Sequence, residues 1–315
     1  MTVGKGSLQY RKVDGWGELP GGVTFDKISG LAVDSRDRVY LFARTPNPVL
    51  VFEQDGAFVG SWGAGVFTRA HGIYIDADDN VFCADDKDHT VRQFTTDGRL
   101  IRTWGEKGVG SKTGYDGKSP ETIVRSAGPF NRPTGIAKSP NGEMFVTDGY
   151  GNACVHRFGR GGELLLSWGS PGSGPGQFHS PHCLRIGRDG RVYVLDKENS
   201  RLQVFTQTGE HLATWGDLNR PNDIFIDAFD RIHVLESPGQ ITVFDLNGGI
   251  ICRWGRDEPF AEDGEHLKRA HTMALDSKGC IYVAGCALDY IVKYEPVGAS
   301  RSKRSAQTIG LFETL

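Results

Sequence analysis

Three of the nine histidines stand near the start of similar strand-like segments, which read AHGIYID, PHCLRIG and AHTMALD. His71, His182 and His271 occupy the same place in these segments. The corresponding residues of three further segments are Ser29, Thr134 and Asn222. Three imidazoles brought to one point make a catalytic zinc site with one open coordination position. The alternative is that three unrelated histidines cap strands or satisfy polar groups of the core.

The residues that follow the second strand-like run of each segment form a second position that is expected to face the site. In chain order they are Arg44, Asp86, Tyr150, Lys197, Ser237 and Cys286. An arginine, a tyrosine and a lysine beside a metal can bind a carboxylate and transfer a proton. Taken singly, Arg44 and Lys197 are equally compatible with solvated loop charges.

Four further residues are candidates for substrate binding around the three histidines. Arg69 and Arg269 each stand two residues before one of them, and either face the mouth of the cleft or cover the sheet edges. His179 forms an HSPH pair with His182 and is expected behind that ligand or in the loop. Asn222 takes the histidine position in the fifth segment.

A repeat organises the chain and gives these residues their register. All six tryptophans precede a glycine, and the units between them contain four runs of four to six residues rich in Val, Ile, Phe and Tyr. Turns such as DADDN, SPNGE and TTDGR separate the runs, as expected for strands joined by tight turns. Six such units predict an all-β, six-bladed β-propeller, NHL-like and forming one domain over residues 1–315. The expected blades are 24–63, 69–105, 131–169, 178–216, 219–255 and 267–298.

The ring geometry explains why the histidines matter. The first strand of each blade lines the central channel, so histidines in blades two, four and six are related by threefold rotation and converge on the axis. Blade six lacks its own Trp-Gly strand, and residues 8–17 (LQYRKVDGWG) are expected to supply it and close the ring. Residues 106–130 form a polar insertion, and residues 300–315 form a tail.

Composition excludes several classes of protein. Glycine is 43 of 315 residues, without a three-residue period, so the chain is not collagen-like. The net charge of -3 on a mixed surface argues against nucleic-acid and membrane partners. No run of about 20 apolar residues occurs, and the first 20 residues do not predict a signal peptide. The six single cysteines fit a reducing, cytoplasmic setting. The oligomeric state stays open.

The motifs FVTDGYGN (145–152), GPGQFHSPHCL (174–184), VLDKENSRLQVF (194–205) and RAHTMAL (269–275) carry a resemblance to a known family. The repeats resemble NHL repeats, and the chain is similar to the peptidyl-α-hydroxyglycine α-amidating lyases over residues 24–295. The resemblance implies a catalytic zinc on His71, His182 and His271. It also implies Tyr150 as the base and Arg44 as the residue that orients the substrate in the cleavage of a carbinolamide. Other divalent transition metals also suit imidazole ligands.

The chain departs from the family at four positions. Lys197 stands where the family has a second arginine, so a point charge replaces a bidentate fork. Thr272 replaces an aspartate that helps to hold a structural calcium, which argues against that ion here. Arg269 replaces a methionine, and Gly151 replaces a cysteine. These differences favour the same scaffold and metal with a different substrate and compartment.

Two other functions compete with a metal-dependent lyase acting on a small carboxylate-bearing amide or hemiaminal. Propellers also host hydrolases of lactones, esters and amides, and the fold alone does not separate these chemistries. The third reading is a non-enzymatic NHL scaffold that presents one face to a protein partner.

Overall fold

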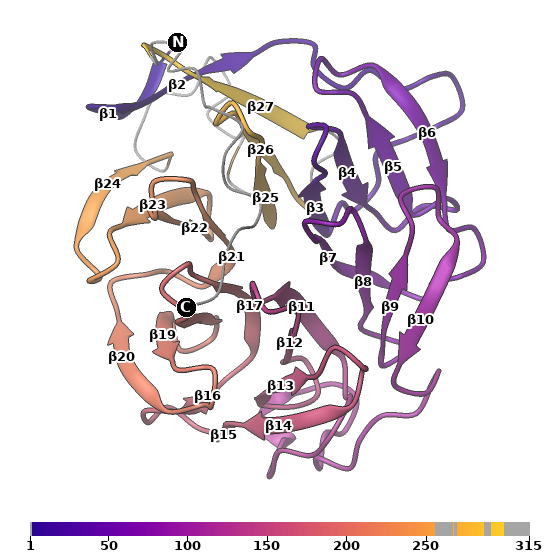
Figure 1. Cartoon of the computed structure of the whole chain (residues 1–315), viewed down its shortest axis with the longest axis vertical. Helices are drawn as coiled ribbons and strands as arrows, with labels where there is room; N and C mark the ends of the chain where they lie inside the picture. Colours follow the sequence, from indigo (N-terminus) through magenta and orange to yellow (C-terminus); the bar gives the residue numbers. More distant parts are fainter. Residues whose placement is uncertain (1, 256–266, 268–269, 287–290, 299–315) are drawn as a thin grey trace, which may run out of the picture.

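The computed structural model describes residues 2–255, 267, 270–286 and 291–298. Within this part of the chain, six antiparallel sheets of four or five strands stand in a ring around a central axis (Figure 1). The predicted all-β, six-bladed β-propeller is therefore confirmed. The predicted tail lies outside the described residues.

Each of the first three blades runs outward in chain order from an axial strand. Blade one contains β3 (Gly30–Val33), β4 (Val39–Phe42), β5 (Val49–Phe52) and β6 (Phe58–Trp62). Blade two contains β7 (Ala70–Ile75), β8 (Val81–Asp85), β9 (Thr90–Phe94) and β10 (Leu100–Trp104). Blade three contains β11 (Pro133–Lys138), β12 (Met144–Asp148), β13 (Cys154–Phe158) and β14 (Leu164–Trp168). A single 3₁₀ turn, η1 (Pro120–Thr122), lies in the insertion before blade three.

The other three blades repeat this order. Blade four contains β17 (Pro181–Ile186), β18 (Val192–Asp196), β19 (Arg201–Phe205) and β20 (His211–Trp215). Blade five contains β21 (Pro221–Ile226), β22 (Ile232–Glu236), β23 (Gln240–Phe244) and β24 (Ile250–Trp254). Blade six contains β25 (Thr272–Leu275), β26 (Ile281–Ala284) and β27 (Ile291–Pro296). A short parallel pair, β15 (Ser170–Pro171) and β16 (Gln177–Phe178), precedes blade four.

The N-terminal segment completes blade six, as the sequence predicts. Strand β2 (Leu8–Val13) pairs antiparallel with β27, so the two ends of the described chain share one sheet (Figure 1). The strand is shorter than the expected 8–17, because Asp14 and Gly15 form a turn in which Gly15 has φ +69°. An additional strand, β1 (Thr2–Lys5), pairs with the outer edge of β2.

Each tryptophan of the repeat packs against an aromatic ring on the third strand of the next blade. Trp62 lies 5.1 Å from Phe94 and Trp254 lies 5.4 Å from Tyr294, measured between ring centroids. Trp16 closes this series by packing 5.5 Å from Phe52 of blade one. Aromatic pairs at such distances add stability beyond the burial of their area. The Trp-Gly repeat therefore joins neighbouring blades at the outer side of the ring.

The first strands form the inner wall of the ring. Each contacts the first strand of the next blade, and β25 contacts β3 to complete the circle. Their first residues therefore surround the axis, and this is where the candidate site lies. None of the described helical segments is long and apolar enough to cross a membrane.

Deletion of residues 1–17 should lower the melting temperature by about 10 °C or more. The deletion removes β2 from β27 and the buried Trp16 from its aromatic neighbours. Loss of a buried tryptophan alone costs about 3–5 kcal/mol, and each kcal/mol shifts the melting temperature of a large domain by roughly 2–4 °C. Thermal unfolding followed by circular dichroism measures this. Deletion of residues 1–6, which removes only β1, is the control. Equal melting temperatures for the 1–17 deletion and the full chain would contradict closure by β2.

Candidate metal centre and active-site cleft

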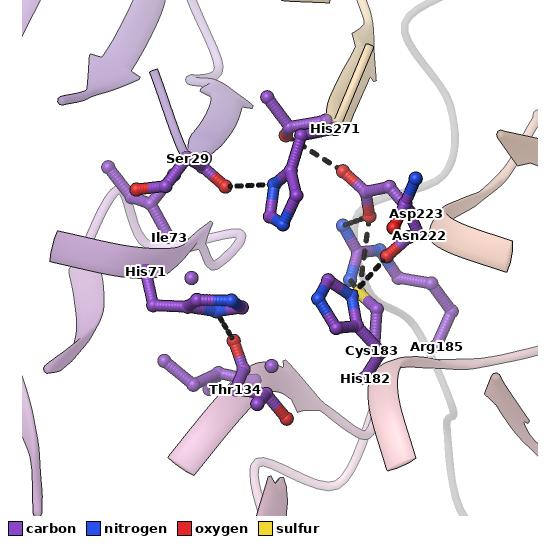
Figure 2. A pocket seen from close by; sticks show the side chains of 15 residues that line it. Ser29, His71, Ile73, Thr134, His182, Cys183, Arg185, Asn222, Asp223 and His271 are labelled. Atoms are coloured by element: carbon purple, nitrogen blue, oxygen red, sulfur yellow. Dashed lines mark hydrogen bonds and ion pairs between the residues drawn. The ribbon is translucent and has the colours of Figure 1, made fainter. Parts of the chain in front are cut away.

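Three histidines from alternate blades meet at the axis. His71 lies on β7, His182 lies on β17, and His271 directly precedes β25. The ring centroids are 5.0 Å apart for His71–His182 and for His182–His271, and 5.3 Å apart for His71–His271. One ligand atom from each residue lies within 4.8 Å of the other two. Figure 2 shows the three rings turned toward one point.

Each imidazole is oriented by a carbonyl of the following blade. The Nδ1 atoms of His71, His182 and His271 lie 2.8, 2.6 and 3.0 Å from the carbonyl oxygens of Thr134, Asn222 and Ser29, respectively. A carbonyl oxygen only accepts, so Nδ1 carries the proton in each ring and donates it. Nε2 therefore keeps its lone pair, which is the form that binds a metal.

Burial keeps all three histidines neutral. It lowers the pKa of His71 and of His182 well below the usual value, and that of His271 to about 3. The nearby Lys197 ammonium is the next largest cause for His182 and His271. Three neutral imidazole nitrogens, from two buried histidines and the partly buried His271, suit a divalent transition metal such as zinc rather than calcium, which prefers oxygen ligands. The donor set thus fits the metal that the resemblance implies.

Tyr150 lies beside two of the three ligand atoms. It follows β12, and its hydroxyl oxygen is 3.0 Å from Nε2 of His71 and 2.9 Å from Nε2 of His182. Burial, followed by the Asp86 carboxylate, raises the pKa of Tyr150, whereas Arg69 and Arg44 act in the opposite direction. The phenol is therefore neutral near pH 7 and can share its proton with a nearby group.

Two of the predicted cations lie close to the histidines. The Arg44 side chain donates from Nε to the carbonyl oxygen of Ala70, 3.3 Å away, which places it next to His71. Lys197 follows β18, and burial lowers its pKa to about 8. Positive charge from both residues acts on the histidines and lowers their pKa values. An anionic group of a substrate would find its partners here.

The remaining predicted residues fall in different places. Asn222 orients His182 through its backbone carbonyl, and its side chain donates to the Ser237 hydroxyl at 2.7 Å. His179 lies in the loop before β17, where its Nε2 is 3.7 Å from a carboxylate oxygen of Glu121 in the insertion. Arg69 pairs with Asp86 at 2.8 Å. Arg269 lies outside the described residues.

Asp86, which the repeat register places after the second strand of blade two, and Arg132, which the sequence did not assign to the site, also reach it. Asp86 is fully buried, and burial raises its pKa to about 6 against the lowering effect of Arg69 and Arg132. The Arg132 guanidinium lies 5.8 Å from the Tyr150 ring centroid. A signal for Arg132 was present in the repeat, because it stands two residues before Thr134 just as Arg69 stands two residues before His71.

A buried polar network lies beside the histidines in the central channel, around a cavity of about 20 Å³. Asp223 accepts hydrogen bonds from the Thr272 hydroxyl at 2.8 Å and from the backbone N–H of Met273 at 2.9 Å. The Arg185 guanidinium is 3.9 Å from the same carboxylate. Figure 2 shows Arg185, Asp223 and Cys183 next to His182. The hydrogen-bond donors and the cation that the Asp223 carboxylate requires are thus supplied by the protein itself.

A second group of potential metal ligands lies buried inside blade three. It consists of Asp148, Cys154 and His156. The Asp148 carboxylate accepts from the backbone N–H of Asn131 and from the Asn152 amide, and His156 lies 3.3 Å away. All three members of the group are fully buried. Asp85 of blade two likewise pairs with Arg92 on the third strand. We therefore interpret this group as a structural contact of the repeat.

Comparison with known proteins places the fold and the site in context. The NHL repeat model matches residues 178–205. A peptidyl-glycine alpha-amidating monooxygenase B of Xenopus laevis is 28% identical over 200 residues, which are 58% of this chain and 22% of that protein. A peptidyl-alpha-hydroxyglycine alpha-amidating lyase 1 of Drosophila melanogaster is 32% identical over 182 residues, which are 52% of this chain and 31% of that protein. The chain thus matches between about a fifth and a third of these relatives.

A solved structure titled as a streptogramin B lyase has the same fold. It superposes with a TM-score of 0.61 at 12% identity, over 87% of this chain and 95% of that one. The ring of sheets and the NHL match define the class: the chain is an NHL-type six-bladed β-propeller. Within that class, it resembles the peptidyl-α-hydroxyglycine α-amidating lyases.

Substitution of Lys197 by methionine should stabilise the metal-free protein most at pH 8 and below. Lys197 has a folded pKa of about 8, below that of the unfolded chain, so the unfolded state binds more protons between pH 8 and about 10.4. The wild type therefore gains stability from this group as the pH rises through that window. The difference in the free energy of unfolding between variant and wild type should therefore decrease by about 2–3 kcal/mol as the pH rises through this window. Urea unfolding at pH 7, 8, 9 and 10 measures it, with Lys118→Met as the exposed control. A constant difference across this range would contradict the buried position of Lys197.

Proposed function

We propose that this protein is a metal-dependent lyase that cleaves the C–N bond of a small, carboxylate-bearing α-hydroxy amide. The products are the free amide and an aldehyde acid. The observation that carries the proposal is the Tyr150 hydroxyl at 2.9–3.0 Å from two of three inward-facing Nε2 atoms. The similarity to amidating lyases supports the same reaction class.

His71, His182 and His271 would hold the metal through Nε2. A divalent cation bound there acts as a Lewis acid, which makes the substrate hydroxyl more acidic. The carbonyls of Thr134, Asn222 and Ser29 hold the rings in the required tautomer. Zinc is the first choice for three imidazole ligands, although iron, cobalt and nickel also accept them.

Arg44 and Lys197 would bind and orient the substrate carboxylate. Arg44 offers the planar fork that matches a carboxylate, whereas Lys197 supplies a point charge from the opposite blade. Lys197 is partly buried, and the reduced screening by water strengthens its interaction with an anion. Together they would place the hydroxyl-bearing carbon near the histidines.

Tyr150 would move the proton that the reaction requires. Cleavage takes one proton from the substrate hydroxyl and gives one to the departing amide nitrogen, while the C–N electron pair goes to that nitrogen. Because burial keeps the phenol neutral, the hydroxyl oxygen of Tyr150 would accept the first proton as it donates its own. General acid–base catalysis of this kind contributes about 10²–10⁴-fold to the rate.

Purified protein should contain roughly one transition metal ion per chain, and His182→Ala should contain almost none. Removal of one of three protein ligands leaves an incomplete coordination shell. Elemental analysis of protein dialysed against metal-free buffer measures the content. His211→Ala is the matched control, since His211 lies on β20 and contacts Thr214. Equal metal contents in wild type and His182→Ala would remove the metal centre from the proposal.

Tyr150→Phe should lower kcat for α-hydroxyhippurate by about 10²–10⁴-fold and leave the metal content unchanged. The variant keeps the ring and its packing and removes only the hydroxyl. Release of glyoxylate from the metal-loaded enzyme measures the rate. Tyr193→Phe is the control, because the Tyr193 hydroxyl donates to Asp189 at 2.8 Å in a surface turn. Unaltered kcat in Tyr150→Phe would remove the proton-transfer role. Turnover of lactones in place of α-hydroxy amides would favour a hydrolase.

A further inference from the structure

A cavity of about 610 Å³ opens between blade two and the insertion 106–130. Its lining includes Arg69 and Asp86 of blade two, Ser111, Lys112 and Tyr115 of the insertion, and Arg132 before blade three.

The insertion is anchored in place, because the Thr113 hydroxyl donates to the Gly151 carbonyl at 2.6 Å. The Asn131 amide also donates to the Ser111 carbonyl at 2.9 Å. These hydrogen bonds therefore hold in place the insertion residues that form one side of the cavity.

This cavity adjoins the candidate active site. The Arg132 guanidinium lies 5.6 Å from the ring centroid of Tyr115 and 5.8 Å from that of Tyr150, and it donates to the Tyr115 hydroxyl at 2.5 Å. The charges of Asp86 and Arg69 act on Tyr150. The same residues thus line the cavity and surround the proposed proton-transfer group. A substrate held at the histidines could extend from Tyr150 past Arg132.

Several polar atoms that line the cavity are buried without a hydrogen-bond partner among the described residues. They are both carboxylate oxygens of Asp86, Nε of Arg69 and the hydroxyl of Ser111. Asp86 contacts Arg69 in an ion pair, yet neither of its oxygens receives a hydrogen bond of ordinary geometry. A buried polar atom without a partner costs roughly 1–3 kcal/mol, so a ligand that satisfies these atoms would bind with a corresponding gain.

The charges around the cavity identify the kind of group that fits. Four basic side chains line it, from Arg69, Lys87, Lys112 and Arg132, against the two acidic side chains of Asp86 and Asp116. The excess of positive charge favours an anion. Oδ2 of Asp86 is paired with Arg69 at 2.8 Å, but Oδ1 has no such partner within the described part of the chain and requires a donor such as an amide N–H.

We propose that this cavity is the subsite for the acyl side of the substrate, and that it takes an acyl chain ending in a carboxylate. The inference rests on the proposed function for the position of the reacting group. The terminal carboxylate accepts from Arg69 and Ser111 and is attracted by the charges of Lys112 and Arg132, while the amide N–H of the substrate donates to Asp86. The preferred substrate is then a dicarboxylate, with one carboxylate at Arg44 and Lys197 and the other in this cavity.

Binding of inert glycine conjugates tests the subsite without turnover. N-succinylglycine and N-succinamoylglycine differ only in a terminal carboxylate or primary amide, and neither carries the α-hydroxyl needed for cleavage. A second pair, N-glutarylglycine and its terminal primary amide, is longer by one methylene group. Isothermal titration of the metal-loaded protein should give, in at least one of the two pairs, a Kd at least about 10-fold lower for the carboxylate than for the amide. Equal affinities within both pairs, or no binding by any of the four, would overturn the proposal.

Variants assign the preference to the cavity. Arg132→Gln and the exposed Lys112→Gln should each reduce the ratio of the two Kd values, the first to below about 3. Lys118→Gln, in the same insertion but outside the cavity lining, should keep the wild-type ratio. A wild-type ratio in both Arg132→Gln and Lys112→Gln would overturn the subsite.

Turnover of α-hydroxyhippurate by the same preparation is measured separately. Discrimination between the conjugates without turnover would support the anionic subsite and refute the lyase reaction. Turnover without discrimination between the conjugates would support the lyase reaction and refute the anionic subsite.

Discussion

The close approach of the inner strands at the axis is the constraint on which the site depends. A Cβ atom on Gly72 would lie 2.3 Å from the carbonyl oxygen of Thr134, which is the acceptor for His71. A Cβ atom on Gly30 would lie 2.9 Å from the carbonyl oxygen of His71. Only glycine allows neighbouring backbones to come this close. The spacing lets a carbonyl of one blade hold the imidazole of another, so the backbone itself sets the tautomer of the proposed ligands.

The outer side of the ring supports this arrangement through a different contact. Each tryptophan of the repeat packs on the next blade, and Trp16 also contacts Tyr282 at 5.0 Å in blade six. The blades are thus joined at the axis by backbone contacts and near the periphery by aromatic rings. Loops at the ends of the second strands carry Arg44, Tyr150 and Lys197, and these loops differ from blade to blade. The repeated part positions the metal ligands, and the varied part defines what can bind.

Much of this architecture could be predicted from the sequence because it is periodic. The Trp-Gly spacing indicated the blade register, and the register aligned His71, His182 and His271. The lack of a Trp-Gly strand in blade six pointed to residues 8–17 as its outer strand. The register placed Asp86 after the second strand of blade two, but the contacts of Asp86 and Arg132 could not be predicted in the same way. Their contacts arise between blade two, the start of blade three and an insertion that has no counterpart in the other blades. The role of Asp86 depends on complete burial beside two arginines, which a local pattern of residues does not encode.

The bond between His271 and the Ser29 carbonyl crosses the seam where the last blade meets the first. During synthesis, a chain with five finished blades has only two of the three imidazoles, and the third is oriented only after blade one docks against blade six. Metal affinity would therefore report whether the ring is complete. An ion present at a thousand times its Kd stabilises the closed form by about 4 kcal/mol. A bound ion would then hold the first and last blades together once the ring has closed.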